Sequence, residues 1–219
     1  MPRLTSPDLI APDPGAAAYH RMLDIAALVD PACAGMDPID GFEIMADAAS
    51  RIACAPLIHG DVSDAVPGFR PRTLGFADIA VLGVAGPVGS ALGGTGIAVS
   101  AFSAAPQQAI DFACWVASAD VQRGVHAQSG GPPGHAAAWQ EVAVNAATGS
   151  FYAAARATLQ RAWVGPRHDG YMTFQAAAAE RITDAVVRRE AAKTVIADIN
   201  RLFRNSFRAG QNSIHATMR

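Results

Sequence analysis

The stretch that decides the predicted fold is LGGTGIAVS, Leu92–Ser100. Its glycines permit a sharp turn or a close approach of the backbone to a ligand. The apolar, partly alternating residues Ile97–Phe102 predict a β-strand. Pro106 suits the first turn of the next helix, where its missing N–H costs nothing. We therefore predict a glycine-rich turn, a strand and a helix, in this order.

Glycines immediately upstream offer a nucleotide-binding alternative. Gly83, Gly86 and Gly89 follow a GxxGxxG spacing. A dinucleotide-binding fingerprint, however, needs a strand before its glycines and a helix that opens directly on them. Here the predicted strand follows the glycines, and the helix begins only at Pro106. A nucleotide site is therefore the weaker interpretation of this region.

The chain before these glycines alternates between proline-rich loops and short periodic segments. Residues 1–14 contain four prolines and predict a disordered leader. Apolar residues then recur at helical spacing up to Asp30. Asp37 and Pro38 predict a second helix start, with Asp37 as the N-cap. Two further strands are predicted at Arg51–Ile58 (RIACAPLI) and Phe76–Val84.

The chain after these glycines is predicted to be mostly helical. Ser118 is the expected N-cap of a helix. The run Gly130–Gly134 predicts a loop, and Gly165-Pro166 predicts a break. Beyond the break, apolar residues up to Phe203 recur at helical spacing and predict long terminal helices, followed by a frayed tail.

Composition excludes several classes of function. A net charge of −2 over 219 residues gives no electrostatic footprint for nucleic acid. The three cysteines, Cys33, Cys54 and Cys114, show no metal-ligand spacing and are predicted to be buried. No HExxH or GxSxG motif is present, so we predict no enzyme, no catalytic or metal-binding residues and no cofactor.

Aromatic and glycine-rich loops with few charges suit a neutral polar ligand, above all a sugar. An aromatic face packs on the C–H face of a sugar ring, while amides and backbone groups bond its hydroxyls. Tyr171 and Phe174 are the preferred aromatic candidates, because the break at Gly165-Pro166 leaves a loop that could present them. Trp139, Tyr152 and Trp163 are further candidates that more commonly occupy a core.

The order of these features resembles a known family, the family 1 (sugar-binding) extracellular solute-binding proteins of ABC importers. The resemblance spans about residues 16 to 206. Its strongest segment is a glycine pair followed by a strand, a serine-containing turn and a proline-started helix. The similar segments are LVDPACAGMDPIDGFEIM, RIACAPLI, LGGTGIAVSAFSAAPQQAIDFACWVAS, SGGPPGHAAAW and AWVGPRHDGYMTFQ, with a last helix that ends in LFRNS.

The resemblance implies an α/β fold of the periplasmic-binding-protein-like type II class, helix-rich and incomplete. It implies the second lobe plus part of the first lobe, with most of the first lobe missing. The expected division is a leader at 1–14, a second-lobe segment at 15–90, a segment re-entering the first lobe at 91–164, and terminal second-lobe helices with the tail at 165–219. The strand near Ile97 would then lack its sheet neighbours and leave apolar surface exposed.

The resemblance also implies a function. The chain is expected to bind a small solute, above all a sugar, and to deliver it to the membrane subunits of an importer. Family members act in the periplasm or outside the cell. The N-terminus of this chain lacks the pattern of a signal peptide, so the chain as written is expected to stay in the cytoplasm. The resemblance places Gly93, Gly94 and Thr95 on the ligand side. The loop that is often Tyr- and Asn-rich in the family reads IHGDVSDAV here, so either His59 and Asp61 take over its contacts or the loop has lost them. Gly131, Tyr171 and Phe174 complete the expected ligand-side residues.

Two other functions remain open from the sequence. The chain could be an interaction module that self-associates through apolar surface which a first lobe would otherwise cover. A small enzyme that uses His59, His168 and nearby aspartates is the less favoured alternative.

Overall fold

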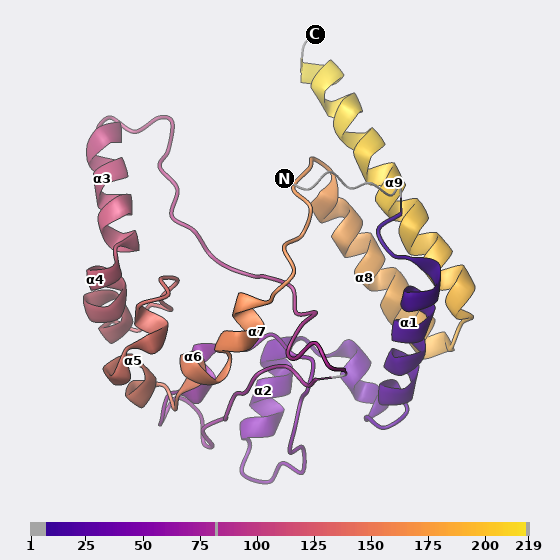
Figure 1. Cartoon of the computed structure of the whole chain (residues 1–219), viewed down its shortest axis with the longest axis horizontal. Coiled ribbons are helices and arrows are strands. Elements are labelled where there is room, and N and C mark those ends of the chain that lie inside the picture. The colour runs from indigo at the N-terminus through magenta and orange to yellow at the C-terminus, as the bar shows by residue number, and fades with distance from the viewer. Residues whose placement is uncertain (1–7, 82, 218–219) are drawn as a thin grey trace. The chain divides into compact units, whose positions relative to one another are not determined.

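The structure is a computed structural model that describes residues 8–81 and 83–217, with side chains up to Phe207 (Figure 1). It is 54% helical and 1% strand, and its described residues form no sheet. The predicted α/β fold of the periplasmic-binding-protein-like type II class is therefore wrong. Among the described residues, the chain is built from helices and long loops.

None of the three predicted strands forms. Residues 51–58, 76–81 and 97–102 are loop, and the β-type pairing recorded in the described residues is an isolated parallel bridge between Ala91 and Trp163. Leu92 N donates to Trp163 O at 2.8 Å, and Trp163 N donates to Ser90 O at 2.7 Å. An apolar run becomes a strand only when a neighbouring segment completes its hydrogen bonds. The described chain supplies no further neighbour.

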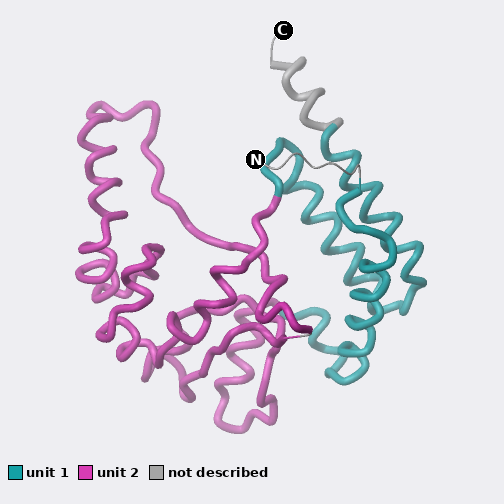
Figure 2. The backbone as a smooth tube through the Cα atoms, viewed as in Figure 1, with its two compact units in different colours: residues 1–36, 166–219 teal, residues 37–165 magenta. Residues whose placement is uncertain are grey.

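The chain divides into two compact units (Figure 2). Unit 1 contains residues 1–36 and 166–219, and unit 2 contains residues 37–165. The predicted break at Gly165-Pro166 is confirmed as loop, and it separates the two units. The first helix begins at Pro12, inside the segment predicted as a leader, whose residues 1–7 lie outside the described part of the chain. The predicted segments 15–90, 91–164 and 165–219 stay a prediction.

Three α-helices build unit 1 and lie side by side (Figure 1). They are α1 (Pro12–Ala26), α8 (Tyr171–Arg188) and α9 (Ala192–Thr217), with a short 3-10 helix η1 (Pro31–Gly35) after α1. Their buried faces form one core, in which Phe203 and Ile199 are almost fully enclosed. Ala178 and Ala185 are also buried there, and such small residues let helices approach closely.

Polar contacts join both the segment before α1 and helix α8 to α9. The buried Asn200 accepts from Ile10 N at 3.0 Å and donates to Ile10 O at 2.8 Å. Arg181 on α8 donates to Glu190 at 2.6 Å and to Asp198 at 3.0 Å. The amide thus ties the start of the chain to the last helix, and the guanidinium ties α8 to α9.

Unit 2 consists of short helices joined by long loops. These are α2 (Pro38–Ala46), η2 (Val62–Ala65), α3 (Pro106–Ala117), α4 (Ala119–Val121), the π-helical turn η3 (Gln122–His126), η4 (Ala138–Gln140), α5 (Val142–Ala147), α6 (Phe151–Ala154) and α7 (Arg156–Gln160). The predicted helix starts at Pro38 and Pro106 are confirmed. At the first of them, Asp37 and Asp40 form a reciprocal capping box. Ser118 does precede α4, but its hydroxyl donates to Trp115 O and caps no N–H.

A row of aromatic rings packs together in unit 2. The rings of Phe42 and Phe76 are 5.7 Å apart, and Phe76 and Phe151 are 4.8 Å apart. Tyr152 continues the row from Phe151 to Trp139, with centroid distances of 5.2 and 5.1 Å. These edge-on and tilted arrangements are the ones that ring quadrupoles favour. The row therefore links α2, the loop that contains Phe76, α6 and η4.

Much apolar surface of unit 2 stays exposed, as the missing sheet neighbours lead us to expect. Ile97 is 52% exposed and Phe102 is 98% exposed. All three cysteines are also exposed, so the prediction that they are buried is wrong. Cys33 lies in a short 3-10 turn, Cys54 lies in loop, and Cys114 lies on α3, which buries no residue. No helix of the described residues is long and apolar enough to cross a bilayer.

Candidate functional site

The structure brings two of the predicted ligand-side residues together. The imidazole of His59 lies so close to Gly93 that a Cβ on this glycine would stand 2.8 Å from His59 Cε1. His59 follows the loop 51–58, and Gly93 follows the bridge between Ala91 and Trp163. Both residues are exposed, so the imidazole and the glycine backbone face solvent together. We call His59, Asp61 and Gly93–Thr95 the candidate site.

Asp61 connects the candidate site to the aromatic row. Its carboxylate accepts from Ser63 N at 2.8 Å and so begins η2. Burial raises the pKa of the Tyr152 phenol to about 12, and the Asp61 carboxylate adds to that rise. Between His59 and Asp61, Gly60 lies against Phe76 and Phe151, where an added Cβ would stand 3.0 Å from Phe76. The row thus supports the loop that carries both polar side chains.

Gly94 and Thr95 complete the candidate site with open backbone. Both residues are exposed, and a Cβ built at Gly94 would meet no described atom within 4 Å. The N–H groups of Gly93 to Ala101 donate to no described residue. Unused backbone donors next to an imidazole can bond the hydroxyls of a polar ligand.

Long-range contacts, which the sequence analysis missed, hold the segment before Gly93 in place. Arg161 donates to Ala85 O, and its guanidinium lies against Gly86. Asp78 accepts from both the N–H and the hydroxyl of Thr158, each at 2.7 Å. No local motif marks these pairs, because their partners lie far apart in the sequence. Together with the Ala91–Trp163 bridge, they align residues 78–92 with α7 and the loop after it.

Gly131 has a different neighbour, His126. Gly131 N donates to His126 O at 2.9 Å, and a Cβ on Gly131 would stand 2.5 Å from the His126 ring. Pro132 O lies 3.4 Å from His126 Nε2. The predicted loop at Gly130–Gly134 is confirmed, and the histidine fills the space that this glycine leaves open. Its recorded neighbours include no residue of the candidate site.

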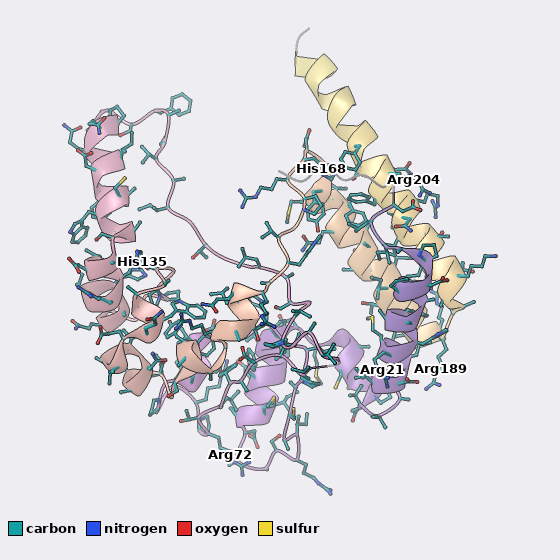
Figure 3. All side chains as sticks on the ribbon, in the orientation of Figure 1. Arg21, Arg72, His135, His168, Arg189 and Arg204 are labelled. Carbon is teal, nitrogen blue, oxygen red and sulfur yellow. The ribbon has the colours of Figure 1, made fainter. Side chains whose placement is uncertain are left out.

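Tyr171 and Phe174 belong to the aromatic core of unit 1. Phe174 is only 6% exposed, and its ring lies 5.2 Å from that of Phe203. Tyr171 contacts Phe174 at 5.6 Å and His168 at 5.7 Å. His168, labelled in Figure 3, lies just before α8. These contacts give Phe174 a packing role that leaves little of its ring for a ligand.

The polar pair His168 and Ser206 could suggest a nucleophile and its base. His168 Nε2 lies 2.8 Å from Ser206 Oγ. The Ser206 hydroxyl, however, donates its proton to Phe203 O at 2.7 Å. The imidazole must then donate to Ser206 Oγ, because the hydroxyl has only one proton to give. In this arrangement the imidazole donates and the serine keeps its proton, and the pair joins the loop before α8 to α9.

Because the pKa of the Tyr152 phenol is raised, we expect the stability of unit 2 to fall at alkaline pH. In the unfolded chain the phenol ionises near pH 10, whereas in the folded chain it ionises near pH 12. The unfolded state therefore binds fewer protons in this interval, and the free energy of unfolding falls as pH rises from about 10 to 12. Replacing Tyr152 by Phe should reduce this fall, as measured by denaturant unfolding at several pH values. An unchanged pH dependence would contradict the burial of the phenol.

No protein-family model matches the chain, and no curated protein matches it. Among the residues that the structure describes, no three His, Cys, Asp or Glu side chains are grouped to hold a metal ion.

Proposed function

We propose that the chain binds a small neutral polar solute of the carbohydrate class at the candidate site. The observation that carries this proposal is the contact of the His59 imidazole with the Gly93 backbone. It unites two loops whose residues were both expected on the ligand side, although they are distant in sequence. The proposal does not require the two-lobed α/β fold, which the structure contradicts.

The chemistry of the candidate site supports a sugar more than a charged ligand. No charged residue occurs from Ile79 to Ile110, so Asp61 is the one acidic side chain among the residues of the candidate site. His59 can donate or accept, Asp61 accepts, and the unused N–H groups after Gly93 donate. Hydroxyl groups are both donors and acceptors, and such a mixed set of partners satisfies them.

The wider role that we propose is that of the solute-binding component of an ABC import system, acting in the periplasm or outside the cell. The order of sequence motifs supports this role, as the resemblance implies. The importer's membrane subunits would then be the protein partners, and the chain would act without catalysis.

Changing Gly93 to Ala should weaken solute binding, because the added Cβ would stand 2.8 Å from His59 and displace the imidazole. Gly96→Ala is the matched control, since its Cβ would meet no described atom within 4 Å. Calorimetric titration of the full chain with a panel of mono- and oligosaccharides measures the difference. We expect the Gly93 variant to bind at least about tenfold more weakly, a loss of about 1.4 kcal/mol.

Two outcomes would overturn the proposal. One is the absence of binding to any sugar of the panel by the unmodified chain. The other is equal binding by both variants, which would place the ligand away from His59. A thermal shift supplies a second readout, because a ligand that binds only the folded state raises its stability.

A further inference from the structure

We propose that a second copy of this chain docks on the surface formed by Ile97, Phe102, Phe112 and Trp115, here called the α3 surface. It comprises one face of α3 and the loop before it. The inference is independent of solute binding, because none of these residues belongs to the candidate site.

The α3 surface is apolar and exposed. Phe102 is 98% exposed, Phe112 is 56% exposed and Trp115 is 53% exposed. Residues 97–103 and α3 line one groove together, to which Ile97, Phe102 and Phe112 contribute. The Trp115 ring lies 5.6 Å from that of Phe112 and extends the same surface. A contiguous apolar surface of this kind marks an interaction site rather than ordinary solvent-exposed surface.

The backbone of the α3 surface requires a polar partner as well. The N–H groups of Gly96 to Ala101 donate to no described residue, although apolar side chains accompany them. An occupant that covers Ile97 would also cover these amides, and buried amides without acceptors are costly. The occupant must therefore bring carbonyl oxygens in an extended segment, which a lipid surface does not do.

The absence of charged residues in this segment further restricts the kinds of partner that fit the α3 surface. The sequence from Ile79 to Ile110 carries no charged residue, and the residues that flank it are Asp78 and Asp111. Anionic membranes attract basic segments, and the segment from Ile79 to Ile110 carries no basic residue. A charged protein partner would lose its hydration here without gaining an ion pair. A second copy matches this surface, since it is equally neutral and apolar.

A symmetric dimer would cover the apolar side chains and would also pair the unused backbone groups. About a two-fold axis, residues 96–101 of each copy can run antiparallel, so that the unused N–H and C=O groups of one meet those of the other. The aromatic rings of α3 then cover the junction from both sides. Phe102, Phe112 and Trp115 together offer on the order of 400 Å² of exposed ring, about half of what each partner buries in a standard interface. Ile97 and the paired backbone supply much of the rest.

Sedimentation of the full chain over a range of concentrations tests the proposal. We expect a dimer with a dissociation constant of about 1 µM or tighter. Phe112→Glu should raise that constant at least about 100-fold, because two carboxylates would face each other across the axis. Val142→Glu is the matched control, since Val142 is a 79% exposed apolar residue of α5 outside the α3 surface.

A backbone variant separates strand pairing from simple hydrophobic contact. Ala98→Pro removes an N–H that donates to no described residue, so the monomer should tolerate it. The same variant should weaken the dimer at least about tenfold, because it removes two symmetry-related hydrogen bonds. Far-ultraviolet circular dichroism reports whether each variant retains its helices.

Three results would overturn the proposal. The first is a monomer at about 100 µM, far above the dissociation constant of a standard interface. The second is a dimer that neither Phe112→Glu nor Ala98→Pro weakens. The third is binding to uncharged phosphatidylcholine vesicles that Phe112→Glu abolishes while no dimer is found, which would assign the α3 surface to a membrane. Sugar binding measured on the same samples stays informative, because a failed dimer leaves His59 and Gly93 untouched.

Discussion

Replacement of Phe203 by Ala should lower the free energy of unfolding of unit 1 by about 3–5 kcal/mol, the usual cost of removing a buried phenylalanine. Phe203 is 1% exposed and contacts Phe174, His168 and Phe207 through its ring. Removing it leaves a cavity between α8 and α9 that these rings can fill only in part. Hydrogen exchange of the full chain, analysed by peptide, measures the effect in α8 and α9.

Phe207→Ala is the matched control for this prediction. Phe207 lies on the same helix one turn later but is 41% exposed, so its truncation removes less buried area. It should cost about 1 kcal/mol, in line with partial burial. If both variants lose the same protection, Phe203 does not form the centre of the core.

Gly170→Ala should destabilise unit 1 by about 3–5 kcal/mol, because two separate costs coincide. Gly170 has a φ of +95°, a conformation that L side chains rarely adopt. An added Cβ would also stand 2.4 Å from Ser206 O, a backbone atom that cannot move alone. Chemical denaturation of the full chain, monitored through the helical signal, gives the size of the loss.

A second glycine separates these two costs. Gly130 has a φ of +80°, but a Cβ there would meet no described atom within 4 Å. Gly130→Ala should therefore show the cost of the conformation alone, about 1–2 kcal/mol. An equal loss in both variants would mean that the start of α8 does not approach Ser206 as closely as the structure shows.

The helix starts were predictable because their signals are local. Asp37 caps α2 through the N–H of a residue three positions away, and proline opens both α2 and α3. Each signal depends on a few neighbouring residues and needs no knowledge of the remaining fold. The break at Gly165-Pro166 is local in the same sense.

The strands were not predictable from the same information. Ile97–Phe102 has suitable residues, but a strand also needs a neighbour at hydrogen-bonding distance, and the apolar pattern cannot show whether one exists. The resemblance itself implied that the strand near Ile97 would lack its sheet neighbours, and the described chain does not contain them. The prediction that the cysteines are buried was wrong for a related reason. Cys114 would be buried only if another element covered α3.

The candidate site was predictable in part. The resemblance placed Gly93 on the ligand side, and His59 was expected there as a replacement for the family's loop residues. The structure brings these two together, and their contact with a ligand stays a prediction. The resemblance gave no information on Arg161 or Thr158, which position the segment before Gly93 from much later in the chain. Tyr171 and Phe174 were chosen because a break precedes them, but sequence alone does not reveal the aromatic partners that enclose Phe174.

The division of unit 1 between the two ends of the chain has a consequence for synthesis. Helix α1 leaves the ribosome long before α8 and α9, and most of the described residues that pack against its core face lie on those helices. All of unit 2 is synthesised in that interval. Helix α1 therefore lacks its packing partners on α8 and α9 at a time when the loops around Gly93 and the α3 surface have already left the ribosome. On one messenger, neighbouring ribosomes would hold several such unfinished chains close together. Pairing through α3 could therefore precede completion of unit 1, and the two events would occur in the opposite order to that of a dimer assembled from finished subunits.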